Sequence, residues 1–440
     1  MTDAFRRYAG VALLAAVLIV LATVGGVAPL SDTDQLWPPV YSINRLAVVG
    51  PDAQIRSYLP DGSGEMSISS GQGLFTWPTW APDGKTVAFS GIVRNSEGQP
   101  VVTLFGYDWE NSEIYRIHEG EPGYAGLLAD GVVHYPLWSP DSSKLAFVAV
   151  TRLHGLSLFV DEVAATSAPA FVIDRGPLWM SWSTDSSRLA VHRSFDHFVV
   201  TFEDDIRMQR IRLESDTYRV PAWRPDLSEL TLSSPVGRAG YGLYSAPLTN
   251  SGIVLPQPIS EVGRASAFLW SPDGSHLAVA DDVRPVRYGN TPVLVYRRFR
   301  MLESATFSET AVFNENILSY FWSPDGTKVA LVTIADSGGE LRWTLLDAAT
   351  GSTIRLVDFT PSRDQLTMFQ FFDQYAYSHL LWSPDSRFLV FAGRLSFSAS
   401  SAGLMAQSDR GGSTVYLIDT GPVTTIDEVA IGVLAFWSPV

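Results

Sequence analysis

The sequence of 440 residues contains no cysteine and few basic residues. The lack of cysteine excludes disulfides, thiolate metal sites, cysteine nucleophiles and an acylated lipoprotein cysteine. Lysines and arginines number 31 against 46 aspartates and glutamates, and the resulting net charge of -15 argues against nucleic acid as a partner because it repels phosphate backbones. Hydrophobic residues make up 46% and charged residues only 18%, so the chain can bury a large core.

Motifs for catalysis and metal binding are also missing. The sequence has no Gly-x-Ser-x-Gly elbow, no Gly-x-x-x-x-Gly-Lys-Ser/Thr phosphate loop and no His-Glu-x-x-His helix. Its seven histidines show no metal-ligand spacing, and the acidic clusters Glu203-Asp204-Asp205 and Asp281-Asp282 fit solvated loop charge better than a calcium site. We therefore predict a protein that is not an enzyme and needs no cofactor or metal ion.

Long hydrophobic runs are confined to the N-terminus. Tyr8 to Leu30 carries no charge, and 23 helical residues reach about 34 Å, enough to cross a hydrocarbon core of roughly 30 Å. Arg6 and Arg7 precede this run, which predicts a cytoplasmic N-terminus and export of everything after it. A cleaved signal peptide, leaving a secreted or periplasmic protein, is the alternative. We expect an anchor over residues 1–30, a tether over 31–43 and one domain over 44–440.

A short pattern recurs along that domain. Eight of the thirteen tryptophans begin a Trp-Ser-Pro-Asp-Gly motif or a close variant of it. The tryptophans and the aspartates three residues later are Trp80 and Asp83, Trp138 and Asp141, Trp182 and Asp185, Trp223 and Asp226, Trp270 and Asp273, Trp322 and Asp325, Trp382 and Asp385, and the terminal Trp437 without an aspartate.

The residues of the motif predict a tight hairpin. Proline presets the first corner of a type I turn, aspartate accepts hydrogen bonds from the turn's own amides, and glycine takes the left-handed position. Ser142, Ser186, Ser386 and Leu227 replace that glycine, so we expect those turns to be strained or differently shaped. Recurrence of the aspartates indicates that they hold turns and are not catalytic.

The spacing of the motifs predicts the fold. Consecutive tryptophans lie 41 to 60 residues apart, with room for about four strands in each interval. This spacing is typical of an all-β protein, a β-propeller of eight blades. Because the repeat unit after Trp223 is weak, a propeller of seven blades is the alternative. Val433 to Ser438 should supply the innermost strand of a blade whose other strands come from about 44–70, which closes the ring.

These Trp-Ser-Pro-Asp-Gly turns resemble the repeats of the TolB-like, WD40-like propeller family over about nine-tenths of the chain. The resemblance implies an exported propeller that binds other proteins, and similar propellers also sit on larger peptidases. The sequence departs from TolB itself, because no separate α/β domain precedes the propeller and a probable anchor stands where TolB has a secretion signal.

A propeller ring has two unlike faces. The motif turns lie on one face, which we call the motif face, and the longest connections fall on the other, which we call the open face: Glu119 to Gly131, Asp281 to Pro292, Thr360 to Tyr377 and Arg394 to Gly412. Aromatic and polar residues begin the innermost strands there and predict either blade packing or a binding mouth. The candidates are Trp77, His134, Tyr135, Trp179, Tyr218, Arg219, Tyr377 and His379.

The connection that contains Met368, Phe369, Phe371, Phe372 and Tyr375 is the most apolar of these. It would either dock a partner or fold over a neighbouring blade. Together these features predict a membrane-anchored, extracytoplasmic propeller that binds a protein or peptide. An accessory subunit of an envelope complex is the more specific form of this prediction. The alternative is a glycan-binding or glycan-processing propeller with carboxylates about 5 to 9.5 Å apart at the channel mouth.

Overall fold

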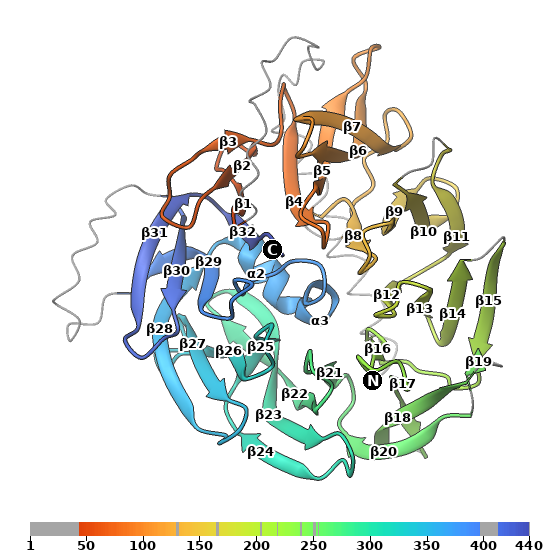
Figure 1. Cartoon of the computed structure of the whole chain (residues 1–440), viewed down its shortest axis with the longest axis vertical. Coiled ribbons are helices and arrows are strands. Elements are labelled where there is room, and N and C mark those ends of the chain that lie inside the picture. Colours follow the sequence, from red (N-terminus) through yellow and green to blue (C-terminus); the bar gives the residue numbers. More distant parts are fainter. Residues whose placement is uncertain are drawn as a thin grey trace.

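The computed structural model describes residues 44–128, 132–163, 167–202, 205–217, 219–237, 240–249, 252–253, 255–396 and 412–439. The predicted anchor and tether lie outside these residues. Within them, small antiparallel sheets stand around a ring with two short helices at its centre (Figure 1). The chain is a β-propeller, as the repeats predict. No helix of the described residues is both long and apolar enough to cross a membrane.

Four sheets of the first half follow one another in the order of the chain, with the first strand of each innermost (Figure 1). Their strands are β4 (Leu74–Trp80), β5 (Thr86–Arg94), β6 (Pro100–Asp108) and β7 (Glu113–Glu119); β8 (Tyr135–Trp138), β9 (Lys144–Thr151), β10 (Gly155–Glu162) and β11 (Ala170–Asp174); β12 (Leu178–Trp182), β13 (Arg188–Arg193), β14 (Asp196–Phe202) and β15 (Ile206–Ile211); β16 (Ala222–Trp223), β17 (Glu229–Val236), β18 (Gly240–Thr249), β19 (Gly252–Ile253) and β20 (Gln257–Val262).

The second half forms one continuous path of paired strands. Two contacts join its sections: Tyr296 pairs with Ile317, and Phe359–Pro361 pairs with Gly393–Leu395. Its strands are β21 (Ala267–Trp270), β22 (His276–Tyr288), β23 (Thr291–Glu303), β24 (Glu309–Phe313), β25 (Ile317–Trp322), β26 (Lys328–Ile334), β27 (Leu341–Asp347), β28 (Thr353–Pro361), β29 (Phe388–Leu395), β30 (Thr414–Asp419) and β31 (Thr425–Ile431).

The two ends of the described chain share one sheet, in the order β3-β2-β1-β32. Its strands are β1 (Leu46–Val49), β2 (Ile55–Tyr58), β3 (Met66–Ser67) and β32 (Leu434–Trp437). Leu46 pairs with Trp437, and the Ser438 amide donates to the Arg45 carbonyl at 2.8 Å. The predicted closure of the ring by the C-terminal strand is confirmed.

The motif turns have one shape whatever residue stands at the fourth position after tryptophan. Gly84, Gly274 and Gly326 have φ of 74°, 69° and 70°, and the four substituted positions Ser142, Ser186, Leu227 and Ser386 have φ of 62°, 62°, 61° and 59°. Of the two alternatives expected for these four turns, a strained turn is observed and a differently shaped one is not. The hairpin geometry holds the left-handed conformation even where a side chain opposes it.

The motif aspartate fixes each turn, as predicted. Asp141 shows the pattern: its Oδ1 accepts from the hydroxyl of Ser139 at 2.6 Å and from the amide of Ser143 at 3.0 Å. The same two bonds recur at Asp185, Asp273 and Asp325. Although partial burial opposes ionisation, these donors lower the pKa of Asp141 to about 2.

Six of the eight motif tryptophans join their blade to the preceding one. The indole Nε1 of Trp138 donates to the carbonyl of Thr79 at 3.2 Å, and that of Trp182 donates to Leu137 at 3.0 Å. Trp223, Trp322 and Trp382 repeat this bond, while Trp270 donates to the Thr231 hydroxyl instead. The same six tryptophans that make these bonds also line the central channel.

Candidate functional site

The connection between β28 and β29 forms a helical plug. It was expected as part of the long loop Thr360 to Tyr377, but it folds into α2 (Arg363–Gln370) and α3 (Phe372–Tyr375), which lie in the middle of the ring (Figure 1). Strand β28 ends on the open face, so α2 and α3 fill the channel from that side. We call residues 362–379 the plug.

Polar contacts fix the start of the plug. The Ser362 side chain caps α2 by accepting from the Gln365 amide at 3.0 Å, and its hydroxyl donates to the carbonyl of Val433 near β32. Gln365 is fully buried and accepts from the Ala392 amide of β29 at 3.1 Å. The plug is thereby attached to two neighbouring blades at its first turn.

Apolar side chains of the plug fill the channel from within. Phe369 and Phe372 are fully buried. Phe369 packs against Trp343 with ring centroids 5.6 Å apart, and Phe372 packs against Tyr320 at 4.8 Å. Of the two alternatives that the sequence left open for these residues, burial in the ring is the one observed; Phe371 alone of the plug's phenylalanines is substantially exposed, at 41%.

The opposite side of the plug contacts the first blades. Tyr375 stacks on Trp77 at 4.7 Å and meets Tyr135 edge to face at 5.6 Å. The Tyr135 hydroxyl donates to the carbonyl of Gln374. Trp77, Tyr135 and Tyr375 are all at most 3% exposed, so the structure gives them a packing role.

One buried ion pair also ties the plug to the ring. Arg219 Nη1 lies 3.3 Å from Asp373 Oδ1, and the same guanidinium donates to the Ala265 carbonyl at 2.7 Å. Burial by itself lowers the pKa of Arg219, but nearby Tyr296 and Asp373 more than reverse this and raise it. Tyr218, predicted beside Arg219, lies outside the described residues.

Of the remaining predicted residues on this face, His134 and His379 are enclosed, Trp179 is half-buried, and only Tyr377 is largely exposed. His134 is 1% exposed, contacts the Ser90 hydroxyl at 3.1 Å, and has its pKa lowered to about 3 by burial and by nearby His118. Trp179 packs against His192 at 5.5 Å. His379 is 1% exposed and contacts the Ser378 hydroxyl at 2.6 Å. Tyr377 is the exception at 42% exposed.

A cavity of about 520 Å³ occupies the motif-face end of the channel, below the plug. Its floor includes Ala376, Tyr377 and His379, and its wall consists of motif tryptophans and the apolar residues next to them. The wall residues are Leu137, Trp138, Ser181, Trp182, Trp223, Leu269, Trp270, Ser271, Phe321, Trp322, Leu380, Leu381 and Trp382. This cavity therefore opens on the motif face, whereas the long connections predict a binding mouth on the open face.

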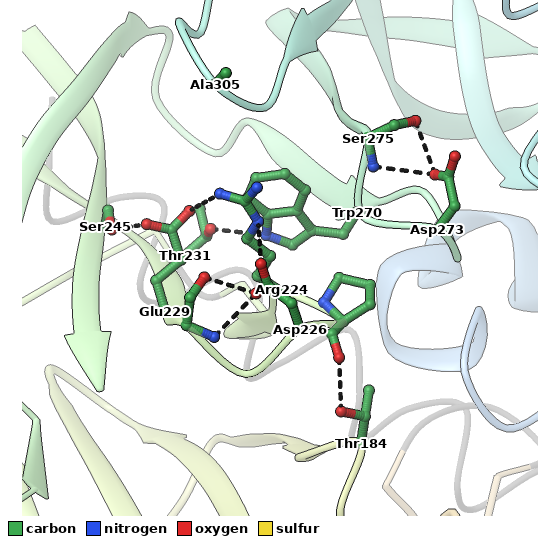
Figure 2. Close-up of polar contacts among 12 residues, drawn as sticks. Thr184, Arg224, Asp226, Glu229, Thr231, Ser245, Trp270, Asp273, Ser275 and Ala305 are labelled. Atoms are coloured by element: carbon green, nitrogen blue, oxygen red, sulfur yellow. Dashed lines mark hydrogen bonds and ion pairs between the residues drawn. The ribbon is translucent and has the colours of Figure 1, made fainter. Parts of the chain in front are cut away.

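The rim of this cavity is made of prolines. Pro82, Pro140, Pro225, Pro272, Pro324, Pro384 and Pro439 line it, one from each motif, and Thr184 takes the proline's place in the motif of Trp182. The Thr184 hydroxyl donates to the carbonyl of Pro225 at 2.9 Å (Figure 2). No aspartate, glutamate, lysine or arginine is among the residues that line the cavity. It is an uncharged, apolar funnel, and we call it the motif-face funnel.

Sequence reasoning missed a polar cluster beside the funnel, in the weakest repeat. Arg224 replaces the motif serine, and its guanidinium carbon lies 5.1 Å from the centroid of the Trp270 ring (Figure 2). Its Nε is 3.2 Å from Asp226 Oδ2, and its Nη1 is 3.5 Å from Glu229 Oε1. The Ser245 hydroxyl donates to Glu229. The sequence contained a signal for this cluster, because Arg224 stands where most of the motifs have serine and Asp226 and Glu229 follow it closely. A half-buried arginine needs carboxylates nearby to compensate its charge.

Two other expectations change in the structure. Asp281 to Pro292 is mostly strand, because β22 and β23 extend to Tyr288 and from Thr291. Asp281 is 1% exposed and pairs with Arg298 at 2.7 Å and Arg300 at 3.1 Å, so it is not solvated loop charge. The described residues hold no group of three or more metal-ligating side chains; Glu203, Asp204 and 397–411 lie outside them.

Comparisons with known proteins support the fold alone. No protein-family model and no curated protein matches this chain. One similar solved structure is a eukaryotic initiation factor, which is 12% identical over 90% of this chain and 99% of that chain, with a TM-score of 0.53. The dihydro-heme d1 dehydrogenase NirN in complex with DHE is 14% identical over 94% of this chain and 80% of that chain, also with a TM-score of 0.53. TolB from Acinetobacter baumannii is 15% identical over 78% of this chain and 80% of that chain, with a TM-score of 0.38. The initiation factor and NirN, with TM-scores above 0.5, agree with the β-propeller fold seen in the sheets, and at 12% and 14% identity they show the fold alone.

Proposed function

We propose that this protein is a binding propeller that holds an apolar segment of a protein partner in the motif-face funnel. The observation that carries the proposal is the funnel itself, a cavity of about 520 Å³ lined by tryptophan and proline with no charged side chain. Ligand sites commonly occupy 300 to 1,000 Å³ and are lined mainly by apolar and aromatic groups. In a chain of net charge -15, an uncharged wall selects against charged occupants, because a charge buried there would have no partner.

The chemistry of the wall favours a peptide over a small polar solute. Flat aromatic rings beside rigid prolines form the kind of surface on which proline-rich or aromatic peptide segments dock. The Thr184 and Tyr377 hydroxyls and His379 are the polar groups that the lining offers for backbone amides and carbonyls. A partner segment with one or two large apolar anchors would match this arrangement.

The wider setting completes the proposal. We count the ring as eight blades, with β32, β1, β2 and β3 as the closing blade, and we retain the N-terminal anchor with the propeller outside the cytoplasmic membrane. Strand β1 runs antiparallel to β32, whose end carries the last motif tryptophan, so the chain enters the ring from the motif face. A tether from the bilayer would then hold the funnel toward the membrane, where this chain would serve as an accessory subunit of an envelope complex.

The glycan alternative finds no support at the funnel. Glycoside chemistry needs two carboxyl groups about 5 to 9.5 Å apart beside the sugar. The lining of the funnel contains no carboxylate, and Asp373 on the plug is buried and paired with Arg219. Binding of an apolar peptide is therefore the single function that we propose.

The experiment places a photo-cross-linking residue at Thr184, on the rim of the funnel, in the full chain in its native membrane. A control carries the same residue at Val423, which is 75% exposed in the β30–β31 connection on the same face. We expect a protein adduct at position 184 and not at 423, and loss of the adduct when Tyr377→Asp places a charge on the floor. Equal adducts at both positions, or adducts with lipid alone, would overturn the proposal.

A further inference from the structure

The polar side chains in the wall of the motif-face funnel already have partners within the protein. Each of the six lining indoles donates its N–H to an acceptor of the preceding blade. The hydroxyls of Ser181, Thr184 and Ser271 each donate to a neighbouring carbonyl or carboxylate. Among the described residues, the wall therefore offers a ligand apolar contact but no uncommitted side-chain donor.

Tyr377 on the floor differs from the wall. It is 42% exposed, and its hydroxyl has no hydrogen-bond partner among the described residues. His379, the other polar side chain of the floor, is only 1% exposed and already contacts the Ser378 hydroxyl. Burial and, to a smaller extent, the charge of Asp373 raise the pKa of Tyr377, so its hydroxyl stays neutral inside the ring. Of the lining side chains that the structure describes, Tyr377 is the accessible one that can both donate and accept.

A ligand that fills the funnel must replace the water that satisfies this hydroxyl. A hydrocarbon tip would leave the hydroxyl buried without a partner, whereas a tip with a neutral O–H would restore the hydrogen bond. An anionic tip would find no cation among the lining residues. An aromatic ring that carries one neutral hydroxyl matches both parts of the funnel, because the ring packs against tryptophan and proline while the hydroxyl reaches the floor.

We infer that Tyr377 determines the specificity of the funnel and that the partner segment is anchored there by a tyrosine side chain. The inference rests on the proposed function, because it names the side chain by which the partner is held. The hydroxyl of the anchor forms a hydrogen bond with the hydroxyl of Tyr377, and its ring contacts the lining tryptophans. A phenylalanine anchor makes the same ring contacts without this bond, so it should bind about five- to tenfold more weakly.

Three capped tripeptides, acetyl-Pro-X-Pro-amide with X as tyrosine, phenylalanine or 4-carboxyphenylalanine, test the inference. The prolines keep each probe extended and uncharged outside X. Binding to the purified full chain is followed by tryptophan fluorescence, excited where tyrosine does not absorb, because six tryptophans line the funnel. We expect the tyrosine peptide to bind about five- to tenfold more tightly than the phenylalanine peptide, and the carboxylate peptide to bind most weakly. Equal binding of the first two, tightest binding of the third, or no binding at all would overturn the inference.

Tyr377→Phe removes only the hydroxyl and should abolish the preference for the tyrosine peptide while the phenylalanine peptide binds as before or more tightly. Tyr115→Phe on β7, 37% exposed and outside the lining of the funnel, is the matched control and should keep the preference. A preference that survives in Tyr377→Phe would overturn the role of Tyr377. If the preference depends on Tyr377 and no protein adduct forms at Thr184, the proposed function fails alone; if the adduct forms while the tyrosine and phenylalanine peptides bind equally, this inference fails alone.

Discussion

Where serine stands at the fifth position of the motif, it links neighbouring turns as well as shaping its own. The hydroxyl of Ser142 accepts from the Asp83 amide at 2.9 Å, and Ser386 accepts from the Asp325 amide at 3.0 Å. Both serines hold a left-handed backbone that costs a non-glycine residue roughly 1 to 2 kcal/mol. The bond to the preceding motif, worth about 1 kcal/mol, offsets much of that cost.

Ser386→Ala and Ser386→Gly separate the two effects. Alanine keeps the strain and leaves the Asp325 amide without its acceptor, so we expect a loss of about 1 to 2 kcal/mol in the free energy of unfolding. Glycine loses the same bond but relieves the strain, so its loss should be at least about 0.5 kcal/mol smaller. Denaturant unfolding of both variants measures the difference, and equal losses would refute the strain.

Buried histidines should make the protein sensitive to mild acid. Burial lowers the pKa values of His134, His197 and His379 to about 3, from the usual value near 6.5. Below pH 6.5 the unfolded chain binds protons at these positions and the folded chain does not, so the free energy of unfolding falls as the pH falls from 6.5 toward 3. Each histidine contributes up to about 1.4 kcal/mol per pH unit.

Asp161 acts in the opposite direction, because burial raises its pKa to about 6 and the folded chain keeps a proton there between pH 6 and 4. We therefore expect a net slope below the sum of the three histidines. Chemical unfolding at pH 7, 6 and 5 checks the sign, and His197→Gln should reduce the slope. A stability that is constant or rises from pH 7 to pH 5 would contradict the prediction.

Among the elements, the plug depends on its surroundings for its structure. Helices of eight and four residues are too short to be stable alone in water, so their contacts with the ring must supply the stability. Phe369 and Phe372 provide the apolar contacts, and the Arg219–Asp373 pair provides the polar one. The plug closes the channel from the open face and thereby defines the floor of the funnel.

Breaking the ion pair from one side should be costly. Asp373→Leu leaves the guanidinium of Arg219 buried without its counterion, and Arg219→Met leaves the carboxylate likewise, so each should destabilise the protein by roughly 3 kcal/mol. The double variant Arg219→Met with Asp373→Leu leaves no unpaired charge and should cost less than the sum of the two single changes. Unfolding free energies in a double-mutant cycle measure this, and additive losses would contradict the coupling.

The sequence predicts the repeated elements far better than the single ones. Seven hairpins and the closing strand follow from motifs whose turn chemistry is local and recurs. The plug occurs once, and its aromatic content suggested a loop or a docking patch. A helix signal was present, because Ser362 and Gln365 have the spacing of a capping box and Met368, Phe369 and Phe372 follow at helical intervals. What no local pattern gives is that this helix fills the channel.

At the scale of the whole molecule, the plug decides which face of the ring is free. Connection length pointed to the open face, but the longest described connection folds inward and occupies the mouth there. The motif prolines, which the sequence analysis assigned only to turns, become the rim of a cavity because all of them lie at the same end of the inner strands. Turn residues in a closed ring thus acquire a second role that depends on the neighbouring blades.

The closing blade interrupts the ring of indole hydrogen bonds. Six motif tryptophans donate to the preceding blade, but in the described residues the buried Nε1 atoms of Trp80 and Trp437 have no acceptor. These two tryptophans flank the contacts of the closing blade with its neighbours. The chain ends meet there through four residue pairs between β1 and β32, as many as join β8 to β9 and β21 to β22. What distinguishes the closing blade is therefore the lack of indole hydrogen bonds on both of its sides.

Trp182→Phe and Trp437→Phe test this difference with the same change of side chain. Both lose similar packing, but only Trp182→Phe also leaves a buried acceptor, the Leu137 carbonyl, without its donor. We expect Trp182→Phe to cost about 1 kcal/mol more in the free energy of unfolding. Native-state hydrogen exchange should show β1 and β32 opening at a lower free energy than β9 or β26, because their junction lacks the indole bonds on both sides. If β1 and β32 exchange as slowly as β9 and β26, the ends are joined as firmly as any two blades, and the missing indole bonds have no consequence for the ring.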